Sequence, residues 1–329
     1  MAVMSSVPAQ AMILAAGRDD SGELLERAGI DPAATEPSLI DADAFYSVLE
    51  LIVADGDQAL PYRYGRLTEV DRLGVMGMAL KTADSLRTAL ERAVRYIALL
   101  GDAVHYELRD TDHGGATFII GGRPASRPGV ALANEGAVAA VLAICRQIAA
   151  TDAPLDPQAV SFAHRAPTAV AEAEAYFGCP VGYGAAFDGL HLDRAFLETA
   201  TRLADAAISE YLVGRLDDQL KDALAQRGLQ ARVRHVIANG LADGVPPMRV
   251  VAGRLGLSER TLHRRLGDEG LRYQDLVVDV RQTVATALLT TTDHPLVDIA
   301  FLTGFSEQSA FQRAFKRWTG RTPLEVRRG

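Results

Sequence analysis

The side chains with the most distinctive chemistry lie in two polar segments within the last hundred residues of this 329-residue chain. One segment follows Ser258 and is rich in arginine, and the other follows Ser306 and combines glutamine with arginine. Arginine can donate two hydrogen bonds to the edge of guanine, and glutamine can pair in the same way with adenine. Both segments therefore carry side chains suited to contacting DNA bases. The candidate residues are Ser258, Arg260, Thr261, His263, Arg264, Ser306, Gln308, Ser309, Gln312 and Arg313.

These candidates divide by the kind of contact that each can make. The two serines are expected to cap helices, and their hydroxyls or the helix N-termini can also reach phosphate, which positions a protein without reading sequence. For Arg264 and Arg313 an alternative to a base contact is open, because an arginine can contact only the phosphate. Four basic residues farther along are expected to contact phosphates or solvent: Lys316, Arg317, Arg321 and Arg327.

The first polar segment is expected to begin a helix behind a glycine-containing turn. A short helix opens at Val250 and ends at Gly256, and Ser258 caps a second helix that buries Leu262 and Leu266. Two short helices around such a turn are typical of a helix-turn-helix.

The second polar segment repeats this arrangement. A short helix around Ile299 ends at Gly304, and Ser306 caps a helix over residues 307–318 that buries Phe311 and Phe315. A longer helix over residues 273–291 is expected to bridge the two units. If both units dock on one face of a duplex, their reading helices should lie about one helical turn apart, roughly 34–36 Å.

The rest of the chain predicts a domain of mixed helices and strands. Residues 85–100 place apolar side chains at i, i+4 and i+8, which indicates an amphipathic helix. Alternation at 104–109 and 116–120 predicts a β-hairpin, and the apolar residues 130–149 predict a buried central helix. Further helices are expected at 22–29, 41–54 and 169–177, and further strands at 159–163 and 185–192.

A polar helix over about residues 194–225 is expected to lead out of this domain. Its loose apolar stripe fits packing on its own domain or on a second copy of the chain. Gly228 marks the boundary at 226–230, so the expected domains are 1–229 and 230–329. The fold class is an α+β N-terminal domain followed by an all-α domain, in which two helix-turn-helix units are joined by a bridging helix.

The charge of the chain is divided unevenly. The formal net charge is −8, yet residues 230–329 hold 15 Lys and Arg against 10 Asp and Glu. A basic C-terminal part on an acidic body fits a nucleic-acid partner, because cations neutralise phosphates. A solvated basic face would give the same count.

An enzyme is the competing class. No G-x-S-x-G, Walker loop, G-x-G-x-x-G or H-E-x-x-H occurs. Cys179 could serve as a nucleophile with His164 or His191, but a structural role is expected. The sequence predicts no enzyme activity, no metal and no cofactor.

The location is expected to be the cytoplasm. Cys145 and Cys179 form no C-x-x-C pair, which suits a reducing compartment. The start lacks the basic residues of a signal peptide, and the longest uninterrupted apolar run, 137–145, is too short to span a bilayer. No membrane partner is expected.

The C-terminal hundred residues resemble the DNA-binding domain of the AraC/XylS family of transcriptional regulators. The resemblance is carried by the residues at 252–258, 298–306 and 311–320, followed by Thr322 and Pro323. The front of the chain, over about 29–192, is similar to the arabinose-binding-like N-terminal sensor domain found in one branch of that family. The residues at 71–77, 85–100 and 176–181 carry this second likeness.

The resemblance implies a sequence-specific regulator. It places base contacts at Arg260 and Arg264, with His263 as a further candidate, and it implies double-stranded promoter DNA as the partner. It further implies activation through RNA polymerase and a sensor role for the N-terminal domain, for which a small-molecule effector is expected. Whether the protein forms a homodimer stays open. The alternative is a regulator without ligand, controlled by abundance or a protein partner. The effector and its pocket residues stay unassigned.

Overall fold

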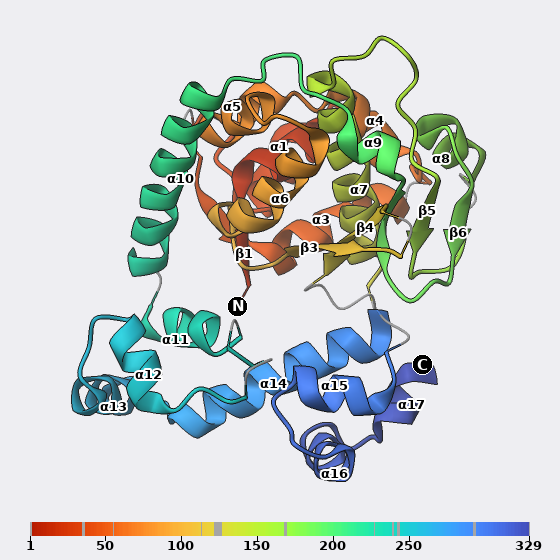
Figure 1. The fold of residues 1–329 in the computed structure, drawn as a ribbon. Coiled ribbons are helices and arrows are strands. Elements are labelled where there is room, and N and C mark those ends of the chain that lie inside the picture. Colours follow the sequence, from red (N-terminus) through yellow and green to blue (C-terminus); the bar gives the residue numbers. More distant parts are fainter. Residues whose placement is uncertain are drawn as a thin grey trace. The chain divides into compact units, whose positions relative to one another are not determined.

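The computed structural model describes residues 2–34, 37–54, 56–112, 114–121, 127–167, 170–226, 228–238, 240–241, 244–291 and 294–328 (Figure 1). The chain divides into two compact units, Met1–Leu220 and Lys221–Gly329. The division falls within one helix, α10 (Ala206–Gln226), and the boundary expected from the sequence follows the end of that helix.

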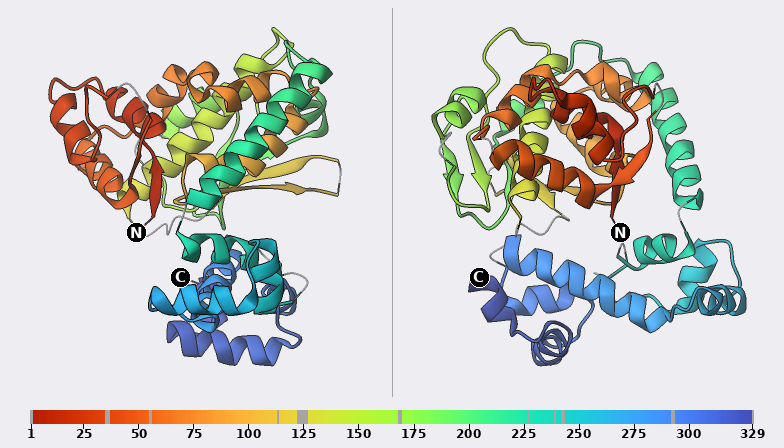
Figure 2. Two further views of the ribbon diagram at one scale, coloured as in Figure 1. Left: turned by 90° about the vertical axis from the view of Figure 1, so that its left-hand side faces the viewer. Right: turned by 180° about the vertical axis from the view of Figure 1, so that it is seen from behind.

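The first unit contains a five-stranded sheet with the order β3-β4-β7-β5-β6. Neighbouring strands are antiparallel except β5 and β6, which are parallel. The predicted hairpin is confirmed as β3 and β4, which project from the helices in the left view of Figure 2. The strands are β3 (His105–Asp110), β4 (Ala116–Gly121), β5 (Ala159–Phe162), β6 (Val181–Tyr183) and β7 (Asp188–Leu192).

In the part of the first unit that the structure describes, shorter helices and a small sheet accompany the central helix α7 (Pro128–Ile148). The α-helices are α1 (Ser6–Leu14), α2 (Ser21–Arg27), α3 (Ala42–Ala54), α4 (Leu60–Leu67), α5 (Val75–Lys81), α6 (Leu86–Tyr96) and α8 (Val170–Phe177), and the 3-10 helices are η1 (Val70–Leu73) and η2 (Ile97–Leu100). The small sheet pairs β1 (Val3–Ser5) with β2 (Leu39–Asp41).

Helix α7 is the structural centre of the first unit. Of the helices that the structure describes, it alone is long and apolar enough to cross a membrane, but 72% of its most apolar stretch is buried inside the unit. It packs against α3, α4, β4 and β7. It is therefore a core helix, as the sequence predicts.

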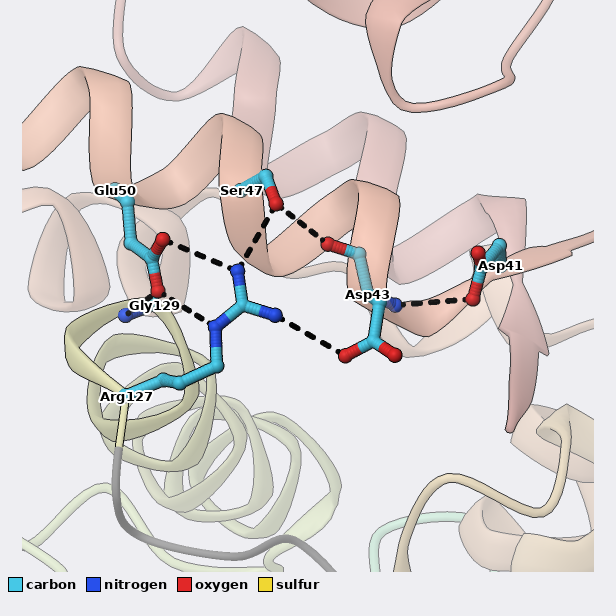
Figure 3. A network of polar contacts seen from close by, with 6 residues as sticks. All are labelled: Asp41, Asp43, Ser47, Glu50, Arg127 and Gly129. Carbon is cyan, nitrogen blue, oxygen red and sulfur yellow. Dashed lines mark hydrogen bonds and ion pairs between the residues drawn. The ribbon is translucent and has the colours of Figure 1, made fainter. Parts of the chain in front are cut away.

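Arg127, which precedes α7, joins that helix to α3 (Figure 3). Its guanidinium donates to both carboxylate oxygens of Glu50, at 2.9 and 3.1 Å, and reaches Asp43 and Ser47. The hydrogen bonds from Arg127 outweigh burial and hold the pKa of Glu50 below its usual range. The Cα of Gly129 lies so close to α3 that a β-carbon there would lie 2.1 Å from the carbonyl oxygen of Tyr46. The absence of a side chain at Gly129 thus sets how closely the two helices approach.

The apolar interior of the first unit forms two clusters. One centres on the sheet, α6 and the C-terminal half of α7, and includes Phe118, Leu142 and Phe162. The other centres on α1 and α3 and includes Ile13 and Phe45. Helix α7 supplies residues to both.

The expected exit helix over 194–225 is wrong as a single helix. The structure has α9 (Arg194–Glu198) and α10, separated by residues 199–205. Bridges Ser85↔Ala200 and Ala149↔Thr201 hold Ala200 and Thr201 extended, and the Thr201 hydroxyl donates to the Lys81 carbonyl at 2.8 Å. These contacts come from distant parts of the chain, so local periodicity does not show them.

The inner face of α10 packs on its own unit, one of the two alternatives that the sequence leaves open. Asp217 accepts hydrogen bonds from Tyr96 at 2.6 Å and from Arg95 at 3.0 Å, and Ser209 accepts one from Arg92 at 2.5 Å. Leu216 is fully buried. Helix α6 therefore holds α10.

The second unit is all-helical. Its helices are α11 (Leu229–Ala238), α12 (Met248–Arg254), α13 (Glu259–Asp268), α14 (Tyr273–Thr291), α15 (Leu296–Leu302), α16 (Gln308–Thr319) and α17 (Pro323–Arg328). Helix α14 belongs to two separate cores. Leu276 and Val280 pack in one with α11, α12 and α13, and Ala285 and Leu289 pack in the other with α15 and α16. The expected bridging helix is confirmed.

Candidate nucleic-acid interface and internal cavity

The first helix-turn-helix comprises α12 and α13. Gly256 has φ +68°, a left-handed conformation that glycine adopts without strain, and it turns the chain between the helices. The predicted cap is confirmed, because the Ser258 hydroxyl oxygen accepts from the Thr261 amide at 3.1 Å. Leu262 and Leu266 are buried, which leaves the opposite face of α13 in solvent.

The second helix-turn-helix comprises α15 and α16, and here the predicted cap is wrong. The residue before α16 is Glu307, in extended backbone, and no side chain caps that helix. Ser306 is exposed and lies one residue too early. The first helical turn instead begins at the Glu307 carbonyl, which accepts from the Phe311 amide at 3.2 Å.

With this correction, α13 and α16 share one register. The first residue of each helix, Glu259 or Gln308, is counted as position one. The fourth and eighth positions are then buried in both helices. They are Leu262 and Leu266 in α13, and Phe311 and Phe315 in α16. The second, fifth and sixth positions then correspond between the helices. The corresponding pairs are Arg260 with Ser309, His263 with Gln312, and Arg264 with Arg313.

The structure places the remaining candidates unequally. Arg260, His263, Arg264, Ser309 and Arg313 are exposed, whereas Gln308 and Gln312 are half-buried. Thr261 is half-buried, and its hydroxyl lies 2.8 Å from the Ser258 hydroxyl. Thr261 thus takes part in the cap.

Two residues of α14 bond to backbone carbonyls of the helix-turn-helices, one before α12 and one between α15 and α16. The Tyr273 hydroxyl donates to the Pro246 carbonyl at 2.5 Å, just before α12. Arg281 donates to the Thr303 carbonyl at 2.9 Å and to the Gly304 carbonyl, and its guanidinium lies 4.0 Å from the centre of the Phe305 ring. Sequence reasoning missed Arg281, because an arginine in a helix usually indicates a solvent-facing position.

Two of the basic residues expected at phosphates already have intramolecular contacts, and one of them is Arg321, which donates to the Glu325 carbonyl at 2.8 Å. Arg327 donates to the His294 carbonyl at 2.6 Å, which ties α17 to the residues before α15. Arg317 is exposed on α16.

A cavity of about 130 Å³, partly open to solvent, lies in the first unit between α1, α4, α6 and α7. Buried apolar side chains such as Met12, Leu90 and Ile148 form most of its wall. Thr68, Glu69 and Arg72 lie at its edge, where Glu69 and Arg72 are exposed and paired at 3.0 Å. Sequence reasoning could not find this cavity, since residues that line a void and residues that fill a core follow the same apolar pattern.

A buried polar cluster lies on another face of α7. His164 Nε2 is 3.0 Å from Glu135 Oε1, and the Tyr62 hydroxyl donates to the other Glu135 oxygen. Burial alone would lower the pKa of His164, but the hydrogen bond and negative charge of Glu135 outweigh it and raise the pKa above 6.5. Asn134 donates to Asp188 at 2.7 Å, and burial raises the pKa of that carboxyl.

The thiol considered as a nucleophile has unfavourable electrostatics. Burial, with a smaller contribution from the negative charge of Asp156, raises the pKa of Cys179 to about 11. Reactive cysteines need the opposite shift, because the thiolate is the nucleophile.

The chain matches families of known proteins in both units. Residues 20–201 match the family described as the arabinose-binding domain of AraC transcription regulator, N-terminal, and residues 251–329 match a helix-turn-helix domain. An ornithine utilization regulator from Pseudomonas aeruginosa is 30% identical over 272 residues, which cover 83% of this chain and 79% of the relative. The regulator VirS from Mycobacterium tuberculosis is 27% identical over 294 residues, 89% of this chain and 85% of the relative.

Among solved structures, the transcriptional regulator CdpR from Pseudomonas aeruginosa is 24% identical, with a TM-score of 0.44 and coverage of 94% of this chain and 96% of that chain. The curated relatives are transcriptional regulators, not enzymes.

Proposed function

The chain belongs to the AraC family of transcription regulators, and from this we propose that it reads promoter DNA with α13 and α16, under the control of a small molecule bound in the first unit. In a helix-turn-helix the second helix enters the major groove and its N-terminal residues meet base edges. One chain would then read two successive grooves.

The observation that carries the proposal is the common register of α13 and α16. Side chains able to contact bases occupy the second, fifth and sixth positions of both helices, opposite two buried positions. Arg264 and Arg313 occupy the sixth position, where each can pair with guanine O6 and N7. Arg260, His263, Ser309 and Gln312 are the other proposed base contacts.

The remaining candidates have positioning roles in this proposal. Ser258 and Thr261 close the N-terminus of α13, whose free amides can face a phosphate. Ser306 and Gln308 lie beside the start of α16 and are proposed to contact the sugar-phosphate backbone of the DNA there.

We further propose activation as the mode of action, in the cytoplasm, through contact with RNA polymerase.

A second copy of the chain is proposed to bind the outer face of α10, where Ile208 and Tyr211 are 49% and 68% exposed. Light scattering on the protein and on a Tyr211→Glu variant tests this dimer. The unchanged protein should have a mass near twice 35.2 kDa, and the variant should not.

The deciding experiment titrates the full chain against DNA from its own upstream intergenic region, with excess random DNA and at two salt concentrations. Specific binding should survive the competitor, and an Arg264→Ala, Arg313→Ala double variant should lose the preference for the upstream fragment while keeping salt-sensitive binding to random DNA. Equal losses on both DNAs would contradict the proposed base contacts.

A further inference from the structure

The cavity of the first unit lies between its two apolar cores. Met12 and Phe45 reach it from the core around α1 and α3, and Leu90 and Cys145 reach it from the core around the sheet. Protein interiors are close-packed and contain few voids larger than a water molecule. An opening of about 130 Å³ between two cores is therefore space that a bound molecule can fill.

Small side chains on two facing helices leave this space open. Helix α7 presents Ala133, Ala137 and Ala140 at helical spacing, and α6 presents Ala89 and Ala93. The wall they form offers methyl groups and no charge.

Polar groups are few in the wall and concentrate at one edge. The buried Cys145 remains a neutral thiol, because burial raises its pKa to about 12. Tyr64 and Tyr106 contribute rings with one hydroxyl each. The charged pair Glu69 and Arg72 is exposed to solvent at the edge.

This lining does not suit a sugar. Each hydroxyl of a pentose loses water on entry and needs a hydrogen-bond partner in return. A wall of alanine, leucine, isoleucine and methionine side chains cannot supply such partners, whereas it favours the burial of hydrocarbon.

We propose that the cavity binds a compound with an apolar body of about the size of a benzene ring and a single polar end that lies at Thr68, Glu69 and Arg72. A cavity of similar volume, about 150 Å³, that is lined by Leu, Ile and Phe takes up benzene. As the identity of an effector, this inference rests on the proposed function; as a binding site, it stands on the cavity alone.

The methionines provide a direct test on the full chain. Met4, Met12 and Met76 line the cavity, whereas Met78 and Met248 do not. With ¹³C-labelled methionine methyl groups, 2-phenylethanol should shift the NMR signals of the first three and leave the other two in place. L-arabinose and L-ornithine should shift none.

A cavity-filling variant supplies the matched comparison. Ala137→Leu should weaken the binding of 2-phenylethanol at least tenfold, while Ala175→Leu, on the exposed face of α8, should leave it unchanged. Unmoved Met78 and Met248 signals show that a variant is folded, and Ala93→Val on α6 provides a second, milder filling.

Three outcomes would overturn the inference: no shift with 2-phenylethanol, shifts in all methionines alike, or shifts of the cavity methionines with L-arabinose. Since no DNA is present in this experiment, a failure of promoter binding would leave its result intact.

Discussion

The guanidinium of Arg264 lies exposed at the sixth position of α13, the position that Arg313 occupies in α16. Replacing Arg264 with alanine should weaken binding to the operator by about 1–3 kcal/mol and relax the preference at one base pair, since a bidentate contact to guanine would be lost. Binding titrations on operators mutated one base pair at a time measure both effects.

Arg317 provides the control for that change. It is exposed farther along α16, so Arg317→Ala should weaken binding to all sequences alike and reduce the salt slope by about one. Identical behaviour of the two variants would assign Arg264 to phosphate instead of to a base.

His164 should make the first unit less stable as the pH rises. Its pKa is raised in the folded protein, so its stabilising contribution is complete below about pH 6.5 and is lost as the pH climbs through the folded value. Between pH 6 and 8, the free energy of unfolding should fall more for the unchanged protein than for His164→Gln, as measured by urea unfolding.

His191 should show the reverse dependence. Burial lowers its pKa, so its contribution is present above about pH 6.5 and is lost as the pH falls. The unchanged protein should therefore gain stability relative to His191→Gln over the same rise in pH. A gain in stability with rising pH at His164 as well would refute the role given to Glu135.

At the scale of elements, the contact between α3 and α7 depends on Gly129. Gly129→Ala should destabilise the protein by roughly 1–3 kcal/mol, because the new β-carbon would collide with the backbone of α3. Gly214→Ala in α10 meets no atom within 4 Å and should stabilise by about 0.5–1 kcal/mol through helix propensity. Thermal unfolding of the two variants distinguishes the effects, and equal shifts would rule out the collision.

The elements that could be predicted are those with a local signal. The stripe of α6, the alternation in β3 and β4, and the Ser258 cap each follow from neighbouring residues. The three-residue strands β1, β2 and β6 could not be predicted, because they are too short to show a period. The sequence misplaced the start of α16 by one residue, since Ser306 is a good cap by type but the residue before the helix is Glu307.

The candidate site likewise has a part that could be predicted from the sequence and a part that could not. The residue types on α13 and α16 indicate base reading, whereas the role of Arg281 and the cavity both depend on tertiary contacts. No spacing within α14 indicates that Arg281 bonds to carbonyls 22 and 23 residues away.

At the scale of the whole molecule, α6 connects the cavity to the helix that leads toward the DNA-binding unit. Ala89, Leu90 and Ala93 line the cavity, while Arg95 and Tyr96 bond to Asp217 of α10. A ligand changes DNA affinity only if it favours one arrangement of such a connection over another.

Asp217→Ala should therefore reduce the coupling between ligand and DNA. A coupling free energy of typical size, about 1–3 kcal/mol, should shrink in this variant, while DNA affinity without ligand stays nearly unchanged. Asp218→Ala, an exposed neighbour on α10, should keep the coupling. DNA titrations with and without the cavity ligand provide the measurement, and intact coupling in Asp217→Ala would exclude this route.

The shared membership of α14 in two cores has a consequence for the evolution of the operator. Leu276 and Leu289 anchor different cores on one continuous helix. The number of residues between these two leucines therefore sets the angle between α13 and α16 about the axis of α14. One inserted residue would rotate one reading surface by about 100° and advance it by about 1.5 Å. If α13 and α16 read DNA as proposed, a change in the length of α14 would therefore require a matching change in the spacing of the half-sites in the operator.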